Sequence, residues 1–113
     1  MAKKLTRLER MFQRSVKQEI MDIFPSCVIH KNPTGVHDGF PDLVCYVGDT
    51  WFMLECKRSE SEAHQPNQDW WVDRLNKMSY ASFIYPENRE EVMAEIRERF
   101  HGYLKDENSE DAA

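Results

Sequence analysis

The chain has 113 residues, of which 41% are hydrophobic and 31% are charged, and its formal net charge is −5. This length supports one hydrophobic core rather than two, and the composition is that of an ordinary folded domain. No stretch approaches the ~20 apolar residues of a membrane-spanning helix, and Lys3-Lys4 is not followed by a signal-peptide core. We expect an intracellular, cytoplasmic protein in which residues 1–105 form a single domain and the acidic residues 106–113 form a disordered tail.

The charge is distributed unevenly along the chain. Acidic residues dominate positions 87–113, whereas six basic residues outweigh Glu9 and Glu19 within the first twenty positions: Lys3, Lys4, Arg7, Arg10, Arg14 and Lys17. Such an asymmetry can leave one face able to contact phosphates despite the negative net charge. We therefore do not exclude nucleic acid as a partner, and we expect its non-specific binding to be modest and sensitive to salt.

Residues 6–24 are predicted to form an amphipathic helix that stops before Pro25. Its apolar stripe repeats at steps of three and four residues and consists of Leu5, Leu8, Phe12, Val16, Ile20 and Ile23. Glu9 projects onto this stripe, which is an unusual place for a carboxylate. Thr6-Arg7-Leu8-Glu9 matches a capping box, so Glu9 can serve the helix terminus, or it can belong to a functional site.

Cys27–Lys31 is predicted to be a short strand, and the turn-forming residues 32–39 follow it as a loop. The loop leads into the segment that carries Asp42, so it borders the candidate site described next. Lys31 and His37 could approach a DNA backbone there. A solvated loop histidine is the alternative interpretation of His37.

Two apolar runs joined by Gly48-Asp49 predict a β-hairpin with a two-residue turn. If these two residues form the turn, counting outward along the ladder places Asp42 opposite Glu55. Facing residues in an antiparallel pair hold their Cβ atoms roughly 5 Å apart. Because side chains alternate between faces, Lys57 lies on the same face as Glu55.

Two carboxylates and an ammonium group are thus expected at one end of an apolar hairpin. Like charges that face each other in a sheet are destabilising, and a divalent cation between them removes the conflict. Carboxylate and carbonyl oxygens are the ligands that Mg²⁺ prefers. The alternative is a surface Glu-Lys pair at a frayed hairpin end, with Asp42 serving the turn after Pro41.

The rest of the chain supplies cover for a sheet that is apolar on both faces. Residues 58–64 form a polar loop in which Arg58 is a candidate DNA contact, and a helix from Pro66 to Met78 follows. Residues 81–85 form a strand that returns parallel to the Glu55 strand, and 87–104 form the last helix. The predicted fold class is α/β, with a mixed four-stranded sheet flanked by helices.

Three motifs now carry a family resemblance. Gly39-x-Pro41-Asp42-Leu43, the Glu55-Cys56-Lys57 triplet and Gln68-x-x-Trp71-x-x-x-Leu75 resemble the PD-(D/E)XK nucleases and, within them, the VRR-NUC branch, whose core is similar to archaeal Holliday-junction resolvases. The resemblance covers about residues 6 to 97. It implies a restriction-endonuclease-like core with the element order α-β-β-β-α-β-α.

The same resemblance implies a Mg²⁺-dependent DNA endonuclease, with Mn²⁺ able to substitute. Asp42, Glu55 and the backbone carbonyl of Cys56 would bind the metal, Glu9 would be a third acidic residue, and Lys57 and Gln68 would position the attacking water. Small proteins of this branch look like homodimers that act on branched or structured DNA. Such proteins occur in phage and bacterial genomes, which fits a phage-encoded protein.

Other functions remain open on the sequence. A sequence-specific restriction or homing-type endonuclease could use the same core. A non-catalytic nucleic-acid-binding module with a decayed site is a further alternative, although a relic need not keep Asp42, Glu55 and Lys57 in register. A structural protein with a fortuitous triplet is the third, and the Gln68 helix makes it less favoured.

Overall fold

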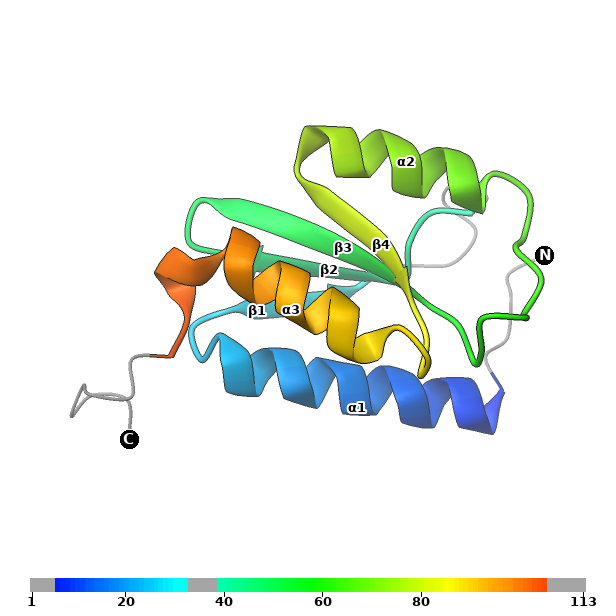
Figure 1. Ribbon diagram of the computed structural model, residues 1–113, viewed down its shortest axis with the longest axis horizontal. Coiled ribbons are helices and arrows are strands. Elements are labelled where there is room, and N and C mark those ends of the chain that lie inside the picture. The colour runs from blue at the N-terminus through cyan, green and yellow to red at the C-terminus, as the bar shows by residue number, and fades with distance from the viewer. Residues whose placement is uncertain (1–5, 33–38, 106–113) are drawn as a thin grey trace.

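The computed structural model describes residues 6–32 and 39–105, and its elements follow the predicted order (Figure 1). They are α1 (Arg7–Ile23), β1 (Val28–Lys31), β2 (Leu43–Val47), β3 (Thr50–Cys56), α2 (Gln68–Met78), β4 (Tyr80–Ile84), α3 (Arg89–Arg99) and the 3₁₀ turn η1 (His101–Tyr103). The predictions made for His37 and for the tail 106–113 lie outside the described residues. None of the helices within the described ranges has both the length and the apolar character needed to cross a membrane.

The four strands form one mixed sheet in the order β1-β2-β3-β4. β1, β2 and β3 pair antiparallel, and β4 joins β3 in parallel after the α2 crossover. The hairpin register is the one predicted from the turn, because Val47 faces Thr50 and Leu43 faces Leu54. The predicted α/β class and the mixed sheet are therefore confirmed.

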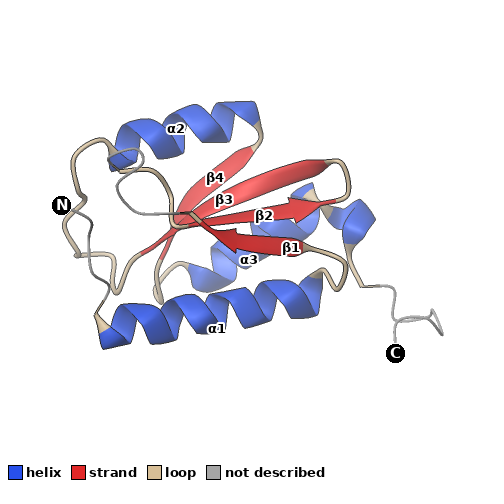
Figure 2. Cartoon of the chain, turned by 180° about the vertical axis from the view of Figure 1, so that it is seen from behind, coloured by secondary structure: helices blue, strands red, loops and turns tan. Residues whose placement is uncertain are grey.

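Helices cover the two faces of the sheet unequally. α2 lies on one face, whereas α1 and α3 lie on the other, as seen from both sides of the molecule (Figures 1 and 2). The residues of the hairpin that face α1 and α3 are apolar and buried: Leu43, Cys45, Val47, Phe52, Leu54 and Cys56. Phe52 lies at the centre of this core, with its ring centroid 6.0 Å from that of Phe24 and 5.1 Å from that of Phe100.

The inner face of α1 differs from the predicted stripe in its first turns. Leu8 is 65% exposed, and the buried residues of the helix are Glu9, Gln13, Val16, Ile20 and Ile23. In Figures 1 and 2 the first turns of α1 lie at the end of the molecule that carries the loop between β3 and α2. The predicted N-cap is correct, since the Glu9 amide donates to Thr6 Oγ1 at 3.1 Å.

Several element boundaries differ from the sequence prediction. β4 spans Tyr80–Ile84 rather than 81–85, and α3 begins at Arg89 rather than at residue 87. The first strand begins at Val28, so Cys27 precedes it. α2 begins at Gln68 rather than at Pro66, because Asn67 takes a left-handed conformation with φ of 70° that no continuing helix allows. α3 ends at Arg99, and η1 then turns back so that the Tyr103 hydroxyl donates to Asp49 Oδ1 at 2.8 Å.

Candidate active site

Asp42 lies directly before β2, one step beyond the pair formed by Leu43 and Leu54. That step places it opposite Glu55, as the turn predicted. The Cys56 amide donates a hydrogen bond to Asp42 Oδ2 at 3.0 Å, which ties the aspartate to the end of β3. In extended backbone the N–H and C=O of one residue point to the same side, so the Cys56 carbonyl is directed toward Asp42 as well.

The segment before Asp42 is held from its other side by the end of β1. The Asn32 amide donates to the Asp42 carbonyl at 2.6 Å, and Asn32 Nδ2 donates to the Pro41 carbonyl at 2.9 Å. Pro41 itself is fully buried. Asp42 is therefore held on two sides, by Asn32 through its backbone carbonyl and by Cys56 through its carboxylate, which is the support that a functional carboxylate needs.

Glu55 and Lys57 are each only 1% exposed. Burying charged groups is costly unless they have partners, and Gln68 at the start of α2 links the two. Gln68 Nε2 donates to Glu55 Oε2 at 3.1 Å, while Lys57 Nζ donates to Gln68 Oε1 at 2.7 Å. The backbone amide of Gln65 also donates to Gln68 Oε1 at 2.7 Å. The orientation of the Gln68 side chain is therefore fixed by two donors to its oxygen and one acceptor for its nitrogen.

The loop after β3 closes over the lysine. Lys57 Nζ donates to the Ala63 carbonyl at 3.3 Å and lies 3.8 Å from Glu62 Oε2. Arg58 in turn pairs with Glu62 at 3.3 Å. The ammonium group is thus surrounded by oxygen atoms from the loop and from α2, and it is aimed at the face that carries Glu55.

Gly39 explains how α2 comes so close to Asp42. Its φ is +80°, and a Cβ atom there would lie 2.5 Å from the Pro66 carbonyl oxygen and 2.6 Å from the Gln68 amide nitrogen. Only glycine adopts this conformation without strain and permits this approach. The glycine of the Gly39-x-Pro41-Asp42 motif therefore sets the distance between the backbone that carries Asp42 and the helix that carries Gln68.

The predicted third acidic residue, Glu9, is buried on the inner face of α1, one turn from the buried Gln13. Within residues 6–32 and 39–105, no three His, Cys, Asp or Glu side chains form a group that could hold a metal ion. Glu9 does not complete such a group with Asp42 and Glu55, so its part in metal binding stays a prediction.

The remaining donor set fits Mg²⁺ better than a transition metal. Mg²⁺ is usually bound by one or two carboxylates and keeps several waters, whereas zinc sites are built from several histidine or cysteine ligands. Asp42, Glu55 and the Cys56 carbonyl supply oxygen ligands only. The three cysteines are free thiols, and burial raises the pKa of both the Cys27 and the Cys45 thiol, which keeps them protonated.

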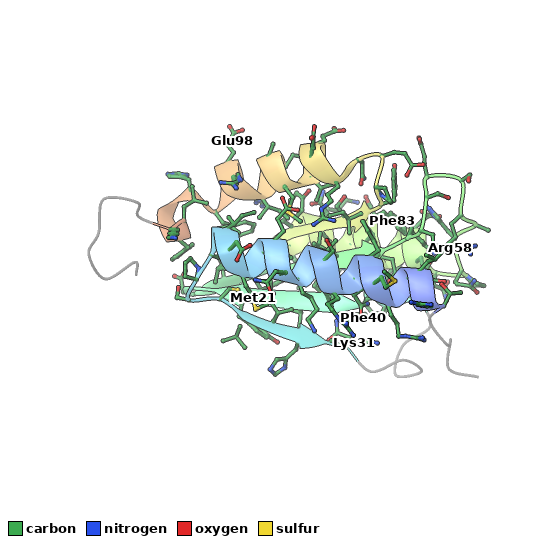
Figure 3. All side chains as sticks on the ribbon, turned by 90° about the horizontal axis from the view of Figure 1, so that it is seen from below. Met21, Lys31, Phe40, Arg58, Phe83 and Glu98 are labelled. Atoms are coloured by element: carbon green, nitrogen blue, oxygen red, sulfur yellow. The ribbon has the colours of Figure 1, made fainter. Side chains whose placement is uncertain are left out.

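Of the predicted DNA contacts, Lys31 and Arg58 belong to the described residues and lie at the ends of different strands. Lys31 ends β1, where it faces Leu43, the residue after Asp42. Arg58 follows Lys57 directly, and its side chain is half-exposed. In the view from below, Arg58 lies near one end of the molecule, whereas Lys31 and Phe40 lie next to each other closer to its middle (Figure 3).

Two features of the site were not predicted from the sequence. The first is the Ala63 carbonyl with Glu62, which holds Lys57 from a loop whose sequence shows only polarity. The second is the burial of Gln13 beside Glu9. The signal that could have indicated Gln13 is its spacing, because residues 9, 13, 16 and 20 share one side of a helix.

Comparison with known proteins agrees with this fold. No family model matches the sequence, and no curated protein matches it significantly. A solved structure titled "VRR_NUC domain protein" resembles the chain with a TM-score of 0.60 and 22% identity, over 88% of this chain and 91% of the other. The fold is that of a VRR-NUC-type domain, and the fold that the motifs indicated is confirmed.

Proposed function

We propose that the protein is a Mg²⁺-dependent DNA endonuclease that hydrolyses phosphodiester bonds. The observation that carries the proposal is the buried, hydrogen-bonded chain of side chains Glu55–Gln68–Lys57, which lies beside Asp42 at the C-terminal end of β3. Buried charges are seldom favourable for stability compared with apolar residues of similar volume, so a chemical role is the better explanation for their presence. The VRR-NUC-type fold supports the same proposal.

Asp42 and Glu55 would hold the metal together with the Cys56 carbonyl. Bound there, Mg²⁺ supplies positive charge to the phosphate and makes a nearby water more acidic. Lys57 would donate a hydrogen bond to a phosphate oxygen, where its positive charge stabilises the negative charge that develops in the reaction, or to the attacking water, which it would orient. Gln68 holds the ammonium group at 2.7 Å and so orients it. Glu9, buried on α1, is the proposed third acidic residue of this site.

We further propose that the DNA is branched or otherwise structured and that the protein acts as a homodimer. A single small domain offers little surface for reading a long sequence, which supports recognition by shape. The exposed apolar side chains of Val28 and Tyr46, which pair across β1 and β2, support the proposed homodimer as a surface that a second copy would cover. Lys31, Arg58 and His37 are the assigned contacts to the DNA backbone.

One cleavage panel tests this proposal. Plasmid, flap and four-way-junction DNA are incubated with the purified protein in Mg²⁺, in Mn²⁺ and in EDTA. We expect cleavage of the branched substrates with either metal, none in EDTA, and none by Asp42→Ala or Lys57→Ala. Cutting of one plasmid sequence at a fixed position would instead identify a restriction or homing-type enzyme. DNA binding that survives both substitutions, with no cleavage by the parent protein, would identify a non-catalytic module.

A further inference from the structure

A row of three aromatic rings runs from the site to the surface of α2. The ring centroids of Phe40 and Trp71 lie 4.9 Å apart at an interplanar angle of 73°. Those of Trp71 and Trp70 lie 4.9 Å apart at 86°. Trp70 is 59% exposed, whereas Phe40 and Trp71 are partly buried. The exposed ring of Trp70 thus packs against Trp71, which in turn packs against Phe40.

Phe40 and Trp71, at the inner end of the row, belong to the two segments that carry Asp42 and Gln68. Phe40 lies two residues before Asp42, in the segment that Gly39 brings against α2. Trp71 lies on α2, one turn after Gln68, whose amide contacts both Glu55 and Lys57. Anything bound on Trp70 is therefore placed in a fixed relation to the residues assigned to the reaction.

A positively charged residue, Arg74, lies one turn after the exposed Trp70 on α2. Trp70, Arg74 and Lys77 follow one another at steps of four and three residues, so they share one exposed side of α2. Lys77 pairs with Asp73 at 3.0 Å, and Asp69 pairs with His64 at 2.7 Å. Arg74 forms no hydrogen bond or ion pair with the part of the chain that the structure describes. Its guanidinium group is available for an anion from outside.

We propose that Trp70 stacks on an unpaired nucleobase and that Arg74 contacts the adjoining phosphate. This inference rests on the proposed nuclease function and narrows its substrate to DNA with unpaired nucleotides next to the cut, such as a flap or a fork. An aromatic ring with an open face stacks on any base, whereas in a continuous duplex the base faces are covered by their neighbours. A second protein copy is the less favoured occupant, because charged residues flank Trp70 and interface centres are poor in charge.

Binding to matched oligonucleotides tests the inference without cleavage. Fluorescence anisotropy in EDTA compares a plain duplex, the same duplex with an unpaired flap, and that flap with abasic sites in place of its first nucleotides. We expect Trp70→Ala to weaken binding of the flap by about five- to a hundredfold and to leave the duplex within about twofold. The abasic flap should bind the parent protein and Trp70→Ala equally weakly.

Two variants control for lost surface and lost folding. Met78 is 66% exposed on the same helix, so Met78→Ala removes exposed apolar area without a ring and should bind the flap as the parent does. Trp70→Phe keeps an aromatic face and should retain most of the preference for the flap. Arg74→Ala should weaken binding of flap DNA and reduce the slope of its salt dependence by about one.

Three results would overturn the inference. They are an equal loss on flap and duplex in Trp70→Ala, full binding of the abasic flap by the parent, or a change confined to the oligomeric state, which would make Trp70 a contact between copies. Cleavage of any DNA by the parent in Mg²⁺ reports on the proposed function separately. If the parent protein cuts DNA but its binding of flap DNA does not depend on Trp70, the proposed nuclease function stands and this inference is wrong.

Discussion

The two faces of the β2–β3 hairpin are built from alternate residues of the same strands and differ in what they bury. Toward α1 and α3, Phe52 and Leu54 contact only the apolar core. Toward α2, at the C-terminal end of β3, Glu55 and Lys57 are buried to the same extent and are linked by Gln68. Burial alone therefore does not separate structural from functional residues in this protein.

The two kinds of burial have different energetic consequences. A fully buried apolar side chain contributes about 1.5–3 kcal/mol to the free energy of folding. A buried charge costs several kcal/mol of desolvation, which its partners repay only in part. We therefore expect substitutions on the core face to lower the free energy of unfolding and to leave the cleavage rate nearly unchanged. Conservative substitutions on the site face should lower the cleavage rate and leave the free energy of unfolding nearly unchanged.

The largest effect is expected for Asp42→Asn. The amide oxygen can still accept the hydrogen bond from the Cys56 amide, so the fold should keep its melting temperature within a few degrees. The lost negative charge removes a metal ligand, and we expect the single-turnover cleavage rate to fall about a thousandfold or more. Thermal denaturation and single-turnover cleavage of the same preparation measure both quantities. A large drop in melting temperature would make Asp42 a structural residue.

Phe52→Ala should show the reverse pattern. Its ring lies at the centre of the core, three residues before Glu55 and on the opposite face of β3, and its removal should reduce the free energy of unfolding by about 3–5 kcal/mol. Cleavage per folded molecule, measured at low temperature, should stay within about a few fold of the parent, since no group in the site is touched. Denaturant titration gives the stability. Loss of cleavage in fully folded protein would show that the two faces are coupled.

Gln68→Ala should separate positioning from folding within the site. Lys57 loses its acceptor at 2.7 Å and keeps the Ala63 carbonyl at 3.3 Å, so the ammonium group becomes less well oriented. We expect the cleavage rate constant to fall about ten- to a hundredfold with little change in the KM for DNA. Gln68→Glu, which offers an oxygen to Lys57 but no N–H to Glu55, should not restore the rate. Recovery in that variant would mean that only the contact with Lys57 matters.

Gly39→Ala should lower both stability and cleavage, each by less than the variant above that is aimed at that property alone. A methyl group at φ +80° meets the Pro66 carbonyl oxygen, so the segment before Asp42 and the start of α2 must move apart. We expect a loss of about 1–3 kcal/mol in stability together with slower cleavage.

Gly102→Ala is the matched control, because a Cβ atom there would meet nothing within 4 Å. It should change neither stability nor cleavage. Equal behaviour of the two alanine variants would show that the approach of α2 to Asp42 does not depend on Gly39.

Local rules sufficed to predict the hairpin and what it carries. A two-residue turn leaves one register, and the alternation of side chains then places Asp42, Glu55 and Lys57 on one face. The observed pairing of Val47 with Thr50 confirms that register. The crossover helix also required β4 to be parallel to β3, as it is.

What escaped prediction depends on contacts between segments that are distant in the sequence. The outward position of Leu8 depends on how α1 lies against the rest of the chain, which periodicity does not indicate, whereas the inward position of Gln13 could have been found from its spacing to Val16 and Ile20. Asn67 is left-handed because the chain must turn next to Gly39, so α2 starts two residues after the proline that suggested its beginning. The closure of residues 62–63 over Lys57 has no local signal at all.

Metal binding by the parent protein and by Asp42→Asn tests the central claim most directly. Calorimetric titration with Mn²⁺, in the presence of a short DNA carrying a non-hydrolysable phosphate linkage, measures it without turnover. We expect saturable binding by the parent and its loss in both Asp42→Asn and Glu55→Gln, while thermal denaturation shows all three proteins folded. Equal binding by the parent and by these variants would contradict the assignment of Asp42 and Glu55 as the metal ligands, and with it the proposed active site.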